Sequence, residues 1–68
     1  MKIFQERLKE QRKLYGLTQR EMAERLGGSQ PSYIRNENGS AEPSQENLVK
    51  IADTFDVSVD YLLGRAEL

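Results

Sequence analysis

The sequence predicts an all-α fold, a compact bundle of five short helices. Apolar residues recur at spacings of three and four, which is typical of one buried helix face. Glycines and hydroxyl residues separate these segments at positions typical of helix ends. No segment alternates apolar and polar residues as a half-buried strand does. The 68 residues include no Cys, so the chain has no disulfide staple and local helical contacts must stabilise it.

The first predicted helix runs from about Ile3 to Tyr15. Phe4 and Leu8 lie on one face of it. Gly16 follows, at the place where glycine commonly ends a helix.

Two shorter helices are predicted next. Thr18 and Glu21 have the spacing of a capping box, which starts a helix that runs to about Leu26. Gly27 then provides the left-handed residue that ends it. Ser29 is expected to cap a third helix over residues 30–37, which ends before the Asn-Gly pair at 38–39.

The last two predicted helices follow Ser44 and Ser58, each placed as an N-cap. The first of them carries an apolar stripe and ends near Phe55. Its members are Leu48, Ile51, Ala52 and Phe55. The second runs from Val59 to Leu63, and Gly64 ends it.

Composition excludes several classes of function. Without Cys or His the chain lacks thiol nucleophiles, imidazole bases and the ligands of zinc fingers. We therefore expect no enzyme activity, no metal or cofactor and no small-molecule ligand. No apolar run approaches the roughly 18 residues of a membrane span, so we expect a soluble, cytoplasmic protein with no membrane contact.

Charge is divided unevenly along the chain. The net charge of −1 disfavours nucleic acid, since nucleic-acid-binding domains are usually basic. However, residues 1–35 carry eight cations and four anions, and residues 36–68 carry two cations and seven anions. This asymmetry indicates a basic binding face in the first half. The alternative is that both halves have ordinary solvated helix faces.

The second and third predicted helices form a helix-turn-helix over about residues 18–38, within a single domain of residues 1–68. Two short helices separated by a three- or four-residue turn with glycine are typical of this DNA-reading motif. Ala23 is small enough for the helices to cross closely, and Gly27 permits the sharp turn. Met22, Leu26 and Tyr33 are expected to form the small core between them.

Short motifs follow one another along nearly the whole chain, from about Phe4 to Arg65. They are Arg7-Leu8-Lys9-Glu10, Arg12-Lys13, Gly16-Leu17-Thr18-Gln19, Met22-Ala23, Leu26-Gly27, Ser29-Gln30, Glu37-Asn38-Gly39, Glu42-Pro43-Ser44, Glu46-Asn47-Leu48, Ile51-Ala52 and Val57-Ser58-Val59-Asp60-Tyr61-Leu62-Leu63-Gly64. In this order they resemble the lambda-repressor-like, Xre-type helix-turn-helix family of bacterial and phage transcriptional regulators, which includes the Cro proteins. Each fragment is weak alone, and the ordered set is specific.

The resemblance implies roles for individual positions. Gln19 and Asn38 match residues that contact the DNA backbone. Gln30 matches the first residue of the reading helix, where Gln can bond adenine, and Arg35 matches a position that reaches guanine or phosphate. The alternatives are an exposed first-turn Gln and a solvated or internally paired Arg. A further implied feature is a structural ion pair between Arg12 and Glu37.

Other positions depart from the family pattern or remain open. Pro31 and Ile34 are expected to touch thymine methyl groups, although Ile34 would pack inward if the helix were rotated. Ser32 is expected on the DNA backbone, or alternatively helps to cap its own helix. Ser40 and Ala41 replace cations that the family often has. Gly28 and Asn36 replace apolar residues, which predicts a loosely held third helix.

Together these features predict a sequence-specific transcriptional regulator, a repressor, that reads the major groove with residues 30–37. We expect Gln30 and Arg35 to project from one exposed ridge. A homodimer through the last helix would bind a pseudo-palindromic operator. Its predicted interface is Tyr61, Leu62 and Leu63, and the alternative is that the apolar run from Val57 to Leu63 belongs entirely to the core. The alternative is a protein-interaction module of the same fold with weak or lost DNA binding.

Overall fold

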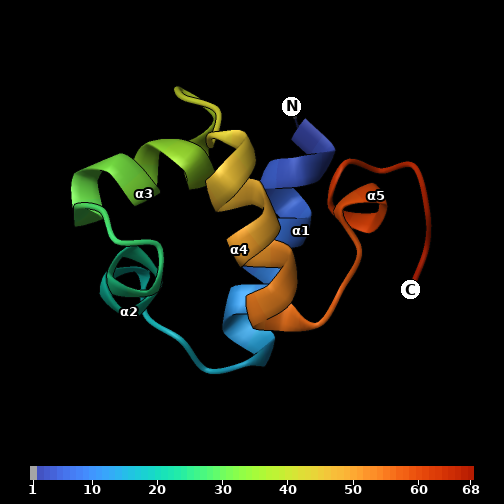
Figure 1. The fold of residues 1–68 in the computed structure, drawn as a ribbon, viewed down its shortest axis with the longest axis horizontal. Coiled ribbons are helices and arrows are strands. Elements are labelled where there is room, and N and C mark those ends of the chain that lie inside the picture. Colours follow the sequence, from blue (N-terminus) through green and yellow to red (C-terminus); the bar gives the residue numbers. More distant parts are fainter. Residues whose placement is uncertain (1) are drawn as a thin grey trace.

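The computed structural model describes residues 2–68, which contain five helices joined by short connections (Figure 1). The helices are α1 (Lys2–Leu14), α2 (Gln19–Arg25), α3 (Gln30–Asn38), α4 (Gln45–Phe55) and α5 (Val59–Leu62). The all-α prediction is confirmed, and the helix ends lie within one residue of those expected. Residue 1 of the predicted domain lies outside the described residues.

Helices α1 and α4 occupy the middle of the molecule, with α2 and α3 on one side and α5 on the other (Figure 1). All five helices contribute side chains to one hydrophobic core. The core residues are Phe4, Leu8, Met22, Ala23, Leu26, Tyr33, Ile51, Ala52, Phe55, Tyr61 and Leu62.

Hydroxyl side chains cap four of the helices as the sequence predicts. Ser29, Ser44 and Ser58 each accept a hydrogen bond from the backbone N–H three residues later. At α2 the bonds are reciprocal: Thr18 Oγ1 accepts from the Glu21 amide at 3.0 Å, and the Glu21 carboxylate accepts from the Thr18 amide at 2.8 Å. These bonds satisfy donors that a helix start leaves without an intrahelical partner.

Replacing Thr18 with Ala should lower the free energy of unfolding by about 1 kcal/mol, because the substitution leaves the Glu21 amide without its acceptor. Urea denaturation measures the loss. Thr18→Ser keeps the hydroxyl and should cost much less. Equal losses in both variants would assign the effect to the threonine methyl group and not to the cap.

Helix α4 ends at Phe55, and the next residue, Asp56, has a backbone conformation that the sequence did not predict. Its φ of 52° places it in the left-handed region, where non-glycine residues are uncommon. Asp tolerates this conformation better than most residues. The turn directs the chain back toward α1, so that α5 packs against both α1 and α4.

The predicted dimer interface is wrong for two of its three residues. Leu62 is fully buried and Tyr61 is 5% exposed. The Arg7 guanidinium lies 4.3 Å from the centroid of the Tyr61 ring, and the Tyr61 hydroxyl accepts a hydrogen bond from Gln11. The apolar run belongs to the chain's own core, since α5 folds onto α1 and α4. Leu63 remains partly exposed.

Candidate nucleic-acid interface

Helices α2 and α3 form the predicted helix-turn-helix. Gly27 has a φ of 72° and turns the chain sharply after α2. Met22, Leu26 and Tyr33 are all buried between the helices, which confirms the predicted small core. Ala23 is also buried, consistent with close packing of α2 against α3. This packing fixes α3 in one orientation.

The outer face of α3 carries most of the side chains expected to meet DNA. Gln30, Pro31, Ser32 and Arg35 are exposed, and Ile34 is half-buried. The inner face is formed by Tyr33, Asn36 and Glu37, which are buried. Helix α3 therefore exposes a polar and basic surface above a closed underside.

Gln30 and Arg35 do not form the single ridge that was expected. Five residues along an α-helix correspond to a rotation of about 140°. Grooves also flank α3 on two sides: Ile34 borders one with Gln19, and Arg35 borders the other with Ala41. Gln30 thus shares a row with Ile34, and Pro31 shares the adjacent row with Arg35. These two rows form a broad exposed surface of α3, in place of the single ridge that the sequence predicted.

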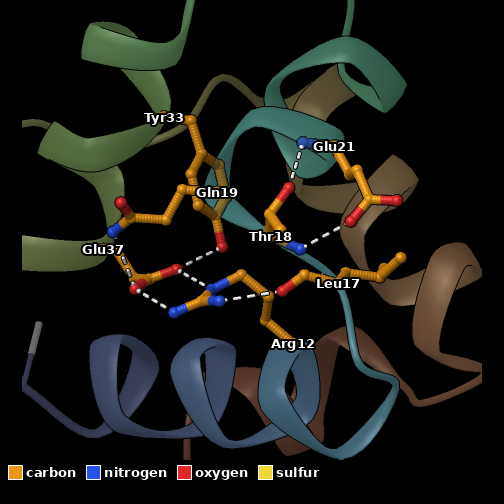
Figure 2. Close-up of polar contacts among 7 residues, drawn as sticks. All are labelled: Arg12, Leu17, Thr18, Gln19, Glu21, Tyr33 and Glu37. Carbon is orange, nitrogen blue, oxygen red and sulfur yellow. Dashed lines mark hydrogen bonds and ion pairs between the residues drawn. The ribbon is translucent and has the colours of Figure 1, made fainter.

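Beneath this surface lies a cluster of polar groups centred on the Glu37 carboxylate (Figure 2). The Arg12 guanidinium donates to it through two nitrogens, at 2.7 and 3.1 Å. The Tyr33 hydroxyl donates at 2.6 Å and the Gln19 amide at 3.3 Å. Arg12 also donates to the Leu17 carbonyl at 2.8 Å. The expected ion pair between Arg12 and Glu37 is present, and it links α1 to α3.

The charges in this cluster stabilise one another. Burial raises the pKa of Glu37, but hydrogen bonds from Arg12 and Tyr33 outweigh burial, so the net pKa is lowered. The hydrogen bond to Glu37 raises the pKa of Arg12. Burial, followed by the bond to Glu37, raises the pKa of Tyr33. Glu37 is therefore an anion whose charge is neutralised inside the protein.

Two amides flank this cluster near the surface. The Gln19 side chain is half-buried and donates one N–H to Glu37. The exposed Asn38 side chain accepts hydrogen bonds at Oδ1 from both the amide and the hydroxyl of Ser40, at 2.9 and 2.8 Å. The acceptor atom of Asn38 is thus used internally, and its amide offers N–H donors to a ligand.

Comparison with known proteins identifies the family. A family model described as helix-turn-helix matches residues 8–62. The chain belongs to the Xre-like helix-turn-helix family. It is 51% identical over 65 residues to the cryptic phage CTXphi transcriptional repressor RstR of Vibrio cholerae. The matched region covers 96% of this chain and 57% of that protein.

Relatives in Bacillus subtilis are similar over the same region. The uncharacterized HTH-type transcriptional regulator YqaE is 48% identical over 90% of this chain and 53% of its own length. The HTH-type transcriptional regulator ImmR is 39% identical over 91% of this chain and 49% of its own length. This chain therefore spans about half the length of these relatives.

In this helix-turn-helix protein, sequence reasoning missed two members of the Glu37 cluster. Tyr33 was assigned to the core as an apolar side chain, and Gln19 only to DNA. Tyr33 and Glu37 are four residues apart on one helix, a spacing that brings side chains together. That spacing could have predicted the contact between Tyr33 and Glu37. The contact from Gln19 had no such signal, because it depends on how α2 crosses α3.

Asn36 is buried at a position where the family usually has an apolar residue, and its side chain forms a hydrogen bond there. It is 8% exposed, and its Nδ2 donates to the Ala41 carbonyl at 3.2 Å. The bond ties α3 to the segment that leads to α4. Gly28 is exposed, with open space around it. The loosely held third helix stays a prediction.

Proposed function

We propose that this chain is a DNA-binding domain of a transcriptional repressor that reads double-stranded DNA with α3. The observation that carries this proposal is the exposed outer face of α3 in a helix-turn-helix whose inner residues are buried. An α-helix fits the major groove of B-DNA, where each base pair presents a distinct pattern of groups. Residues 18–38 would be the reading unit of one domain, acting in the cytoplasm where the DNA is.

The two rows of α3 suit different base contacts. Gln30 has the amide that pairs with adenine N6 and N7, and Arg35 has the guanidinium that pairs with guanine O6 and N7. Pro31 and Ile34 offer apolar surface to thymine methyl groups. Because Gln30 and Arg35 lie in different rows, we expect them to reach different base pairs.

Backbone contacts would position α3 in the groove. Gln19 and Asn38 have amide donors at the edges of the reading surface. Ser32 is exposed in the first turn of α3, and its own amide is capped by Ser29. Its hydroxyl is therefore available for phosphate. Such contacts fix register and carry no direct sequence information.

We further propose that the protein binds as a homodimer to a pseudo-palindromic operator, because two-fold dimers of this motif read two half-sites. Tyr61 and Leu62 are buried and are not proposed as interface residues. Leu63 is partly exposed and lines a cavity of about 250 Å³ together with Phe4, Pro43, Leu48 and the exposed Glu42. This surface is the candidate contact.

Selection of bound duplexes from a random pool, followed by a salt titration, tests the proposal. We expect enriched half-sites separated by about one DNA turn, roughly 34–36 Å between centres. The affinity should fall linearly with salt on a logarithmic plot, because phosphate contacts release counterions. No enrichment, together with a slope near zero on every duplex, would overturn it.

The second candidate is a protein-interaction module of the same fold. The net charge of −1 and the absence of cations at Ser40 and Ala41 favour it. The Ser40 hydroxyl is also engaged by Asn38. The same selection separates the two functions, since an interaction module would enrich no sequence.

A further inference from the structure

We propose that Lys9 on α1 is an additional contact to the DNA backbone, and that it holds one phosphate together with Gln19 and Asn38. The proposal rests on the proposed DNA binding. It adds an element, α1, that sequence reasoning did not assign to DNA.

The geometry points to Lys9 because residues from three helices line one small groove of about 90 Å³. Its lining is Lys9 from α1, Gln19 from α2, and Ile34, Glu37 and Asn38 from α3. Both amides proposed to contact the backbone therefore face the same small space. A phosphate that bonds both of them would meet the Lys9 side chain.

The charge balance of this groove favours a singly charged anion. Glu37 is neutralised by Arg12, as its bidentate bonds show. Lys9 is exposed and takes part in no ion pair among residues 2–68. The groove thus has one uncompensated positive charge, and a phosphodiester carries one negative charge. Glu6 and Glu10 do not line this groove; they border a wider neighbouring groove that Lys9, Glu37 and Asn38 also line.

The hydrogen-bonding groups match the same ligand. The Oδ1 of Asn38 is occupied by Ser40, so Asn38 presents donors. The Nε2 of Gln19 also faces this cluster as a donor. The Lys9 ammonium and the amide nitrogens of Gln19 and Asn38 therefore offer a set of donors, and phosphate oxygens accept hydrogen bonds.

Helix α1 lies close enough to the end of α3 for this role. A side chain at Gly39 would overlap the side chain of Gln5, so α1 packs directly against the turn after α3. Ser40 and Ala41, which follow this turn, carry no charge. Lys9 supplies a cation beside the same turn from a different helix.

The test is the salt dependence of binding for Lys9→Gln on the selected operator. Removing one phosphate contact should reduce the slope of log Kd against log salt by about 0.9. Affinity should fall equally on operator and on unrelated DNA, because phosphate contacts do not read sequence. Lys9→Arg should retain the slope, and Arg65→Gln, which removes an exposed cation that follows α5 in the chain, should not change it.

The outcomes separate this inference from the proposed function. If the unsubstituted protein shows no salt-dependent binding, the proposed function fails. If it binds with a salt slope that Lys9→Gln leaves unchanged, only the role of Lys9 is overturned. Matching urea denaturation curves would show that Lys9→Gln folds normally, as expected for an exposed helix position where Gln is nearly as favourable as Lys.

Neutral methylphosphonate placed at one backbone position at a time locates the phosphate. The substitution that weakens binding of the unsubstituted protein clearly more than binding of Lys9→Gln marks the phosphate that Lys9 contacts. We expect methylphosphonate at the same position to cause a smaller loss of affinity for Asn38→Ala as well. Two different positions would overturn the shared site.

Discussion

Arg12→Met should lower the free energy of unfolding by about 3 kcal/mol, because it leaves the buried Glu37 carboxylate without its charged partner. Glu37 is only 4% exposed, and Arg12 supplies two of its hydrogen bonds. Domains are stable by roughly 0.05–0.15 kcal/mol per residue, so this loss would be a large part of the total. Urea denaturation at neutral pH measures it.

Lowering the pH should reduce the difference in free energy of unfolding between the unsubstituted chain and Arg12→Met. In the unsubstituted chain the pKa of Glu37 is lowered, so the stability it contributes is present above the pKa of an unfolded Glu, about 4.3, and is lost below it. In Arg12→Met, burial should raise the pKa of Glu37, so protonation relieves the unpaired charge. A difference in stability that stays constant down to pH 3 would contradict this explanation.

A double substitution provides the matched control. Arg12→Met with Glu37→Gln removes both charges, and the new amide can still accept from the Tyr33 hydroxyl. The double variant should recover a substantial part of the loss. If it is no more stable than Arg12→Met, the lost stability came from packing of the arginine stem and not from the unpaired carboxylate.

Arg35→Ala should weaken binding to the selected operator by about 1–3 kcal/mol and abolish the preference for one base pair. Arg35 is exposed and forms no ion pair among residues 2–68, so the fold should be unaffected. Competition binding with all four base pairs at each operator position measures the effect.

Arg65→Ala removes the same charge from an exposed position after α5 and should leave the base preference unchanged. A second possible outcome for Arg35→Ala would contradict a role in base reading. An equal loss of affinity on every sequence, with a salt slope smaller by about 0.9, would show that Arg35 contacts phosphate and reads no base.

Sequence alone determined the five helices, their caps and their ends. Thr18, Ser29, Ser44 and Ser58 bond amides three residues away. Such interactions are local, so the sequence contains both partners within one turn. The spacing of apolar residues likewise predicted most of the core, because the helical period decides which residues share a face.

Only the tertiary structure decided how residues from different helices meet. It buried Tyr61 and Leu62, which the sequence had assigned to a partner, because the turn at Asp56 directs α5 back onto α1 and α4. It also placed Lys9 beside Gln19 and Asn38. These outcomes depend on the angles at which helices pack, and those angles arise from contacts between distant parts of the chain that no local pattern encodes.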